Sequence, residues 1–307
     1  CVLASDIDKN AQNTYETNYK LKPMGDIKEI DIDKIPKFDL ICGGFPCQAF
    51  SIAQWKDKKA FDDHRGTLFF EIIKVIDIHK PRCILLENVA HLININKGVV
   101  LQTILNSLKM RGYRVSYQLL SPYQFGIPQN RERVYIIATL SDKEFDFSPL
   151  AARSSTCKLA DILDTDVPED HYIDSSKYVI LENAHIKKQT KSGLKFCGYI
   201  KGNLRKVGAK ENTEHLSRVH RQVMRIYSSD GTHPTLAAST AGRYHIYEEG
   251  TKRVRRLTLN ECYKLMAYPP GFVKHPNRGI AYKQIGNSVC VRVLEEIIKE
   301  MKLQEVM

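Results

Sequence analysis

Residues 68–88, LFFEIIKVIDIHKPRCILLEN, have the pattern of a helix followed by a buried strand. Apolar side chains recur at helical spacing over residues 68–79, and residues 83–86 are an uninterrupted apolar run of strand length. Upstream, residues 38–42 (FDLIC) form another short apolar run that ends at Gly43-Gly44. A strand, a helix and a strand in this order predict a βαβ unit of a mostly parallel sheet.

The alternation of short strands and amphipathic helices continues on both sides of this unit. Further strands are predicted over residues 2–4, 115–120 and 134–140, and further helices over 9–18, 99–110, 258–267 and 289–303. Between about residues 157 and 247 the pattern gives way to short segments rich in glycine, lysine and histidine. The sequence therefore predicts an α/β fold with a second, less regular part.

The net charge is concentrated in one segment of the chain. The 307 residues are 43% hydrophobic and 26% charged, which is typical of a globular protein with a substantial core. The formal net charge of +11 comes from 46 basic and 35 acidic residues. Residues 177–256 hold 17 of the basic and 6 of the acidic residues, so the rest of the chain balances at 29 of each sign. A neutral body with one basic segment indicates a polyanionic partner such as nucleic acid.

Other features argue against membrane, secreted and metal-binding proteins. The longest apolar runs are of strand length, so no transmembrane helix and no membrane partner are expected. The first residues lack the pattern of an export signal, and the eight cysteines show no CxxC spacing, which indicates a cytoplasmic protein with free thiols. Cys42 and Cys47 have no second ligand pair at a suitable spacing, so no metal site is expected.

Polar residues just beyond strand ends are the first candidates for a site, because ligands bind at the carboxyl ends of strands in open α/β sheets. Asp6 follows the first predicted strand, and Asp26 follows another extended segment in Gly25-Asp26-Ile27. Acidic residues at such positions commonly bind ribose hydroxyls or an adenine amine. The alternative for each carboxylate is a helix N-cap or a solvated turn.

Two further strand ends carry reactive groups. Gly43-Gly44 allow a tight turn and Pro46 stiffens the loop, so Cys47 is a candidate nucleophile or, alternatively, an inert small residue. Glu87 leaves a very apolar strand, where partial desolvation would favour its protonated form and make it an acid. The alternative for Glu87 is a buried, hydrogen-bonded structural carboxylate.

Two arginines precede the predicted strand at 134–140. In a strand, Arg131 and Arg133 share one face, so their guanidiniums are predicted to point at one anion or one polar base edge. The alternative is an exposed edge strand with solvated charges.

Taken in order, these segments resemble the motifs of the C5-cytosine DNA methyltransferase family over nearly the whole chain. The matching segments are 43–51 (GGFPCQAFS), 87–89 (ENV), 129–133 (QNRER), 255–262 (RRLTLNEC) and 284–289 (QIGNSV), and 61–70 (FDDHRGTLFF) further resembles bacterial members of the HhaI type. The resemblance implies a Rossmann-like, S-adenosylmethionine-dependent methyltransferase sheet. It implies a catalytic and cofactor-binding domain over 1–152, completed by 280–307, and a smaller, irregular target-recognition domain over 153–279.

For catalysis, the resemblance implies a covalent mechanism on a cytosine that is flipped out of the duplex. Cys47 would add to C6 of the base, and Glu87 would stabilise the adduct at N3. Arg133, supported by Arg131, would bind O2. DNA contacts are implied for the loop after Cys47 and for the target-recognition domain with its Thr-Leu element, at Gln48, Ser51, Arg65, Thr235 and Arg243.

The implied cofactor is S-adenosylmethionine. Its ribose, adenine and methionine parts would contact Asp6, Ile7, Asp26, Ile27, Pro46, Leu68, Asn287 and Ser288. Family members begin with a strand and a Phe-x-Gly-x-Gly loop, and this sequence starts after that motif. We therefore expect either an N-terminally incomplete copy or a strand supplied by a separate polypeptide, and otherwise a monomer. Without that strand, low stability and weak cofactor binding are expected.

The leading hypothesis is a DNA (cytosine-5)-methyltransferase of a bacterial restriction-modification system, acting on a specific duplex sequence. The alternatives are a DNA-binding remnant without a cofactor loop and a tRNA cytosine methyltransferase. An NAD-type oxidoreductase also fits a bare α/β pattern, but the combination of Cys47, Glu87 and Arg133 argues against it. The base-reading residues differ among family members, so no recognition sequence is implied.

Overall fold

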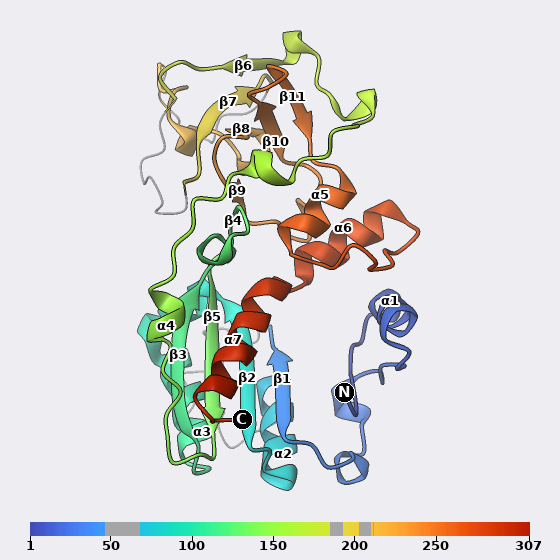
Figure 1. Cartoon of the computed structure of the whole chain (residues 1–307), viewed down its shortest axis with the longest axis vertical. Coiled ribbons are helices and arrows are strands. Elements are labelled where there is room, and N and C mark those ends of the chain that lie inside the picture. The colour runs from blue at the N-terminus through green and yellow to red at the C-terminus, as the bar shows by residue number, and fades with distance from the viewer. Residues whose placement is uncertain (47–67, 185–192, 203–209, 211) are drawn as a thin grey trace. The chain divides into compact units, whose positions relative to one another are not determined.

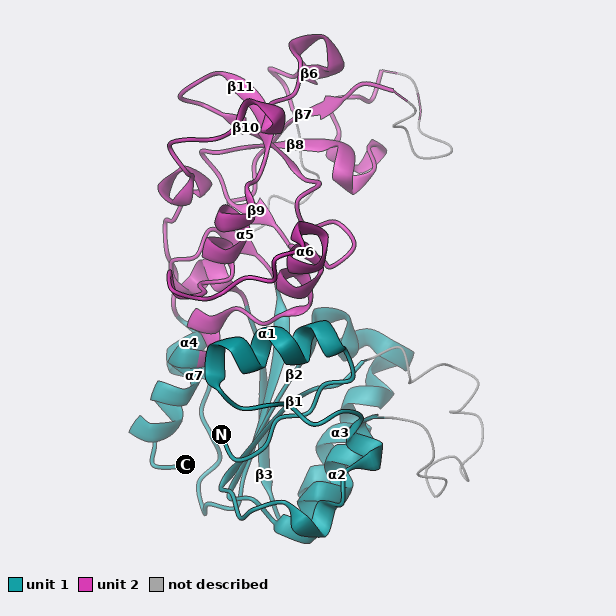
Figure 2. Cartoon of the chain, turned by 90° about the vertical axis from the view of Figure 1, so that its right-hand side faces the viewer, with its two compact units in different colours: residues 1–120, 132–152, 295–307 teal, residues 121–131, 153–294 magenta. Residues whose placement is uncertain are grey.

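The chain folds as two compact units (Figures 1 and 2). The computed structural model describes residues 1–46, 68–184, 193–202, 210 and 212–307. Unit 1 comprises residues 1–120, 132–152 and 295–307, and unit 2 comprises residues 121–131 and 153–294. Residues 121–131 and 280–294 therefore pack within unit 2, although the sequence assigns them to the catalytic domain. The functional domain boundaries stay a prediction.

Unit 1 is built on a four-stranded sheet with the order β1-β2-β5-β3 (Figure 1). Its strands are β1 (Leu40–Gly44), β2 (Cys83–Val89), β3 (Arg114–Leu120) and β5 (Arg133–Thr139). β1 and β2 pair in parallel, whereas β5 runs antiparallel to both of its neighbours, β2 and β3. β5 is reversed because the connection over residues 121–132, all of them described, contains no crossover α-helix.

Three α-helices of unit 1 form close to their predicted ranges, and the short fourth one was not predicted. They are α1 (Lys9–Tyr19), α2 (Leu68–His79), α3 (Val99–Lys109) and the short α4 (Ser148–Ala151), and the last helix of the chain is α7 (Val291–Leu303). Side chains of α2 and α3 pack with those of β2 and β5 in one core, in which Phe69, Ile84, Ile104 and Ile136 are buried. Each such side chain contributes about 1.5–3 kcal/mol when it is fully buried.

The prediction of a strand over residues 2–4 is wrong. Residues 2–4 form no ladder, and only an isolated parallel bridge joins Ser5 to Met24. α1 begins directly afterwards at its N-cap Asp8, and none of its residues is buried. Apolar composition favours a strand only where a partner of matching length lies beside it. Here the extended segments around Ser5 and Met24 are too short for a ladder.

Unit 2 contains a mixed five-stranded sheet with the order β11-β10-β8-β7-β6. Its strands are β6 (Tyr178–Ile180), β7 (Phe196–Ile200), β8 (Arg225–Ser228), β10 (His245–Glu248) and β11 (Arg253–Arg256). Two very short strands, β4 (Gln129–Asn130) and β9 (His233–Pro234), pair in parallel and form a separate two-stranded sheet of unit 2. The irregular pattern of the sequence thus corresponds to short strands and long connections.

Two helices complete unit 2. α5 (Leu259–Leu265) begins at the predicted capping box, in which Thr258 and Glu261 bond each other's backbone N–H groups. α6 (Arg278–Asn287) was not predicted, and the last helix begins at Val291 instead of residue 289. Within the described residues, no helix combines the length and the apolar character that a membrane span requires.

Candidate active site

Glu87 and Arg133 lie side by side at the carboxyl end of β2. Because β5 is antiparallel to β2, Val89 faces Arg133 and Glu87 faces Tyr135, which makes Glu87 and Arg133 diagonal neighbours on one face. Arg133 Nε lies 3.1 Å from Glu87 Oε1, and the two side chains are only 14% and 18% exposed. Two of the four predicted catalytic residues therefore form one ion pair.

This ion pair changes what is expected of Glu87. Partial burial favours a neutral carboxyl group, but a guanidinium in contact favours the carboxylate. Glu87 is thus in contact with a guanidinium and does not stand alone in an apolar pocket. A hydrogen-bond acceptor and a hydrogen-bond donor therefore lie next to each other at this strand end.

The loop that carries Cys47 starts beside Glu87. Gly44, the last residue of β1, pairs with Glu87, and a Cβ built on Gly44 would lie 3.7 Å from Glu87 Oε2. The buried Asn88 side chain donates to the Phe45 carbonyl at 2.7 Å and so fixes the backbone where the loop leaves the sheet. Four predicted site residues of this loop lie outside the described residues: Cys47, Gln48, Ser51 and Arg65.

Arg131 does not lie on a strand face with Arg133. β4 ends one residue before Arg131, and β5 begins at Arg133, so the alternation of a single strand does not apply. The Arg131 side chain is 3% exposed and donates to the backbone carbonyls of Leu236, Gly286 and Ser288. The alternative prediction, an exposed edge with solvated charges, is wrong for Arg131 as well.

Two buried amides have roles that sequence reasoning missed. Asn88 holds the start of the Cys47 loop, as described above. Gln129 is fully buried; its Oε1 accepts from Leu236 N at 3.1 Å, and its Nε2 donates to Leu265 O at 2.7 Å. A buried amide must find partners for both its donor and its acceptor, so an Asn or Gln inside an apolar segment is the signal for such a role.

The predicted cofactor residues at the start of the chain come together in pairs. The parallel bridge between Ser5 and Met24 places the turn at Asp6-Ile7 beside the turn at Asp26-Ile27. Ser5 Oγ reinforces this arrangement by donating to the Gly25 carbonyl at 2.8 Å. The structure thus places two carboxylates at neighbouring ends of two segments that run in the same direction.

Both carboxylates also have one of the alternative roles, a turn at Asp6 and a helix N-cap at Asp26. Asp6 accepts from Asp8 N at 2.8 Å, and Asp26 accepts from Lys28 N at 3.0 Å as the N-cap of the 3-10 helix Ile27–Glu29. An ionised carboxylate offers about four acceptor positions, so a cap leaves room for hydroxyl or amine donors of a ligand. Ile7, at 74% exposure, adds an apolar side chain next to Asp6.

The remaining predicted binding residues are distributed over the two units. Pro46 is exposed, and Leu68 is the half-buried first residue of α2. The others lie in unit 2, where Asn287 and Arg243 are exposed and Ser288 and Thr235 are half-buried. Within the described part of the chain, no three His, Cys, Asp or Glu side chains gather as metal ligands.

Comparison with known proteins identifies the family. A family model described as C-5 cytosine-specific DNA methylase matches residues 1–303. The chain belongs to this family of DNA cytosine-5 methyltransferases. The family and the enzyme class predicted from the motifs are therefore confirmed.

Individual relatives agree with this assignment. The Type II methyltransferase M.HhaI of Haemophilus parahaemolyticus is 33% identical over 306 residues, which cover 97% of this chain and 86% of that protein. The Type II methyltransferase M.DsaV of Dactylococcopsis salina is 35% identical over 310 residues, which cover 98% of this chain and 79% of that protein.

A solved structure confirms the fold. The structure of the Entamoeba histolytica methyltransferase EhMeth superposes with a TM-score of 0.65 at 20% identity, and the match covers 97% of this chain and 88% of that one. The prediction of a Rossmann-like methyltransferase fold is confirmed.

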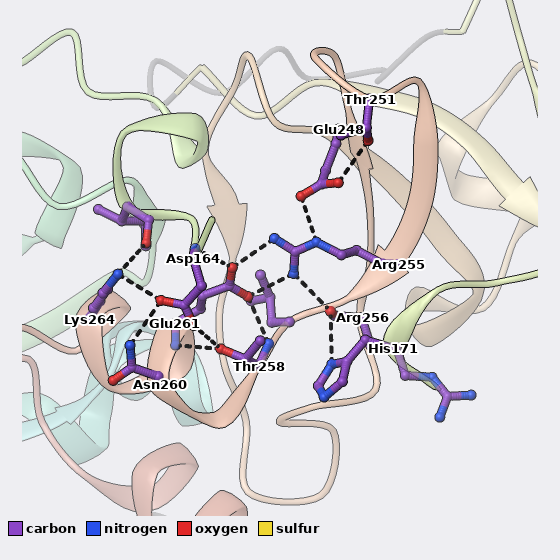
Figure 3. A network of polar contacts seen from close by, with 12 residues as sticks. Asp164, His171, Glu248, Thr251, Arg255, Arg256, Thr258, Asn260, Glu261 and Lys264 are labelled. Atoms are coloured by element: carbon purple, nitrogen blue, oxygen red, sulfur yellow. Dashed lines mark hydrogen bonds and ion pairs between the residues drawn. The ribbon is translucent and has the colours of Figure 1, made fainter. Parts of the chain in front are cut away.

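In this methyltransferase, the segment RRLTLNEC forms a buried ion-pair network within unit 2 (Figure 3). Arg255 of β11 is fully buried and contacts Glu248 at 2.6 Å. It also binds Glu261 through two N–H groups at 2.7 and 2.9 Å. Although burial opposes the charge, the hydrogen bonds to Glu261 and Glu248 raise the pKa of Arg255. The network ties β10 and β11 to the start of α5.

Asp164 extends this network at the start of α5 (Figure 3). Its carboxylate accepts from Lys264 Nζ at 2.8 Å, Thr258 Oγ1 at 2.6 Å and Asn260 Nδ2 at 2.9 Å, and its backbone N–H donates to Glu261. Burial opposes ionisation, but these hydrogen bonds outweigh it and lower the pKa of Asp164. The family segment thus has a structural role within unit 2.

Proposed function

We propose that this enzyme transfers a methyl group from S-adenosylmethionine to C5 of a cytosine that is flipped out of a specific duplex DNA sequence. The observation that supports the proposal best is the Glu87–Arg133 ion pair at the start of the Cys47 loop. Two relatives of similar length are Type II methyltransferases, which supports a place in a restriction-modification system.

The ion pair is complementary to one edge of cytosine. O2 of the base is an acceptor and suits the Arg133 guanidinium, while the N4 amine is a donor and suits the Glu87 carboxylate. When negative charge develops on the ring, N3 takes up a proton from solvent and becomes a second donor to Glu87; N3 returns this proton to solvent when the aromatic ring is restored. The pair therefore stabilises the charged adduct more than the neutral base, which is the requirement for catalysis.

Cys47 supplies the nucleophile in this proposal. Its thiolate forms a bond to C6, and the C5–C6 π electrons make C5 nucleophilic. When bound, S-adenosylmethionine would supply the electrophilic methyl group that C5 takes up, and would leave as S-adenosylhomocysteine. Loss of the C5 proton to solvent then expels the Cys47 thiolate and restores the aromatic ring. Asn88 contributes by holding the backbone from which the Cys47 loop departs.

The paired turns at the start of unit 1 suit the cofactor. Asp6 would accept from the ribose hydroxyls and Asp26 from the adenine amine, with Ile7 and Ile27 against the purine. Acceptor-only carboxylates beside an exposed apolar side chain fit the donors and the flat face of such a ligand. Pro46, Leu68, Asn287 and Ser288 are further proposed cofactor contacts, which follow from the resemblance to the family.

The covalent step is tested by trapping. The full chain is incubated with S-adenosylmethionine and a duplex in which every cytosine is replaced by 5-fluorocytosine, so the recognition sequence need not be known. Fluorine cannot leave C5 as a proton does, so the adduct persists. We expect a denaturation-resistant protein–DNA complex with the wild type and with Cys42→Ala, and none with Cys47→Ala. No complex with the wild type when the N-terminal strand is supplied, or an undiminished one with Cys47→Ala, would refute the mechanism.

The polymer that is methylated is tested separately. Labelled methyl groups should enter duplex DNA and not tRNA, and bisulfite sequencing of a methylated plasmid then gives the recognition sequence. Incorporation into tRNA alone would favour the tRNA alternative. Calorimetric titration with S-adenosylmethionine distinguishes the enzyme from a DNA-binding remnant, since a remnant shows DNA binding without heat from the cofactor.

A further inference from the structure

Arg131 is held among backbone carbonyls of unit 2. Its guanidinium donates to Leu236 O at 2.5 Å, to Ser288 O at 2.7 Å and to Gly286 O at 3.2 Å. The backbone of Arg131 is fixed as well, since its N–H donates to Ser121 Oγ at 3.1 Å. A planar guanidinium can serve several carbonyls in fixed directions at once, whereas a lysine ammonium is a compact point charge that cannot.

Two of these carbonyls belong to the C-terminal end of α6. The last carbonyls of a helix have no intrahelical donor, and they carry the negative end of the helix dipole. Arg131 provides both a donor and a positive charge at this end. It therefore fixes the backbone on both sides of Asn287, at Gly286 and Ser288.

The third carbonyl belongs to the Thr-Leu element, residues Thr235-Leu236. This element has two further contacts with residues 129–131: Gln129 Oε1 accepts from Leu236 N at 3.1 Å, and Thr235 Oγ1 donates to Asn130 O at 2.7 Å. The segment around Arg131 thus holds the Thr-Leu element through both backbone and side-chain groups.

The end of α6 and the residues after the Thr-Leu element also approach each other directly. A Cβ built on Gly286 would lie 2.4 Å from Ala238 N and 2.6 Å from Ala237 C. These are main-chain atoms that a side chain cannot push aside cheaply, so only glycine permits this packing. The close approach is an observation independent of the hydrogen bonds of Arg131.

We propose that Arg131 is a positioning residue that holds the Thr235-Leu236 element and the Asn287-Ser288 end of α6 as one body, so that DNA binding and cofactor binding are coupled. The inference rests on the proposed function, which assigns Thr235 to DNA and Asn287-Ser288 to the cofactor. A ligand that orders one end of this body then favours binding of the other ligand at the other end. By linkage, each ligand raises the affinity for the other by the same factor. Arg131 acts through these elements and not on the base.

The test measures the affinity of the full chain for duplex DNA with and without saturating S-adenosylhomocysteine. The affinity ratio is the DNA affinity with S-adenosylhomocysteine divided by the DNA affinity without it. For the wild type we expect a ratio of about 5 or more, within the usual range of allosteric coupling. Arg131→Lys and Gly286→Ala should each still bind both ligands, but with an affinity ratio of about 1. Gly271→Ala is the matched control, because its added Cβ meets nothing within 4 Å, and it should keep the wild-type ratio.

Amide hydrogen exchange gives a second measurement that a general loss of stability would not reproduce. In Arg131→Lys, exchange should accelerate together at 235–238 and 286–289 and stay unchanged in β8. Independent changes at the two segments, or an unchanged affinity ratio in both variants, would overturn the inference. A wild type that binds both ligands with a ratio of about 1 overturns the inference alone. A wild type that binds neither ligand refutes the proposed function and this inference together.

Discussion

At the scale of single residues, burial keeps two histidines of unit 2 uncharged. Burial lowers the pKa of His233 to about 4 from an ordinary value of 6.5, although the Pro234 carbonyl, 2.6 Å from Nδ1, opposes the shift. Burial and the neighbouring Arg256 likewise lower the pKa of His245 to about 4. Between pH 6.5 and 4 the unfolded chain therefore binds protons that the folded chain does not. The stability that folding gains from keeping these two rings neutral is complete above pH 6.5 and is lost as the pH falls toward 4.

We predict that acid destabilises unit 2 through these two rings. The free energy of unfolding should fall by up to about 3 kcal/mol for each histidine between pH 6.5 and 4. Denaturant unfolding at a series of pH values measures this slope. The slope should be much smaller in the double variant His233→Gln/His245→Gln than in the wild type or in the exposed control His91→Gln. An equal slope in the double variant would contradict the assignment.

The residue pattern gave Glu87 and Arg133 as separate candidates, and the resemblance assigned both to one cytosine, but neither predicted that the two side chains are in contact. Their distance depends on the register of β2 and β5, in which Val89 faces Arg133. Register is set by packing between segments far apart in the chain, and no local pattern records it. For the same reason the guanidinium partner of Glu87 was not predicted from the apolar strand alone.

At the scale of elements, the buried Arg255 network is predicted to control the stability of unit 2. Arg255→Met leaves the fully buried Glu261 without its guanidinium partner and should lower the free energy of unfolding by about 3–5 kcal/mol. Arg256→Met alters the next residue of β11, which is exposed, and should change the free energy of unfolding by less than about 0.5 kcal/mol. Differential scanning calorimetry compares the two variants. Similar losses in both would show that the network is not the cause.

The elements divide into those with a strong local pattern and those without one. α2 and β2 were predicted because their apolar spacing or apolar run is complete within the segment itself. α6 was missed because it contains two glycines and buries only Ala281, Ile285 and Gly286. Its N-cap Asn277, which accepts from Ile280 N at 3.1 Å, was the available signal.

At the scale of the whole molecule, the basic segment over residues 177–256 lies entirely in unit 2. Its formal charges are not equally available to a polyanion. Arg255 is buried between two carboxylates, and Lys195 and Arg253 pair with Asp230 and Glu169. The number of phosphates that the segment can neutralise is therefore smaller than its 17 basic residues. The salt dependence of DNA binding measures that number directly.

We predict that the logarithm of the DNA association constant falls linearly with the logarithm of the salt concentration, with a slope of about −0.9 for each phosphate neutralised. If the exposed Arg243 contacts a phosphate, Arg243→Ala should reduce the magnitude of the slope by about 0.9 and weaken binding to all sequences alike, whereas Arg243→Lys keeps the slope. Fluorescence anisotropy between about 50 and 200 mM salt measures these slopes. Arg111→Ala, which removes an arginine of unit 1 paired with Asp77, should leave the slope unchanged. A wild-type slope near zero would contradict the assignment of the basic segment to DNA, and a wild-type slope retained by Arg243→Ala would exclude Arg243 from the contact.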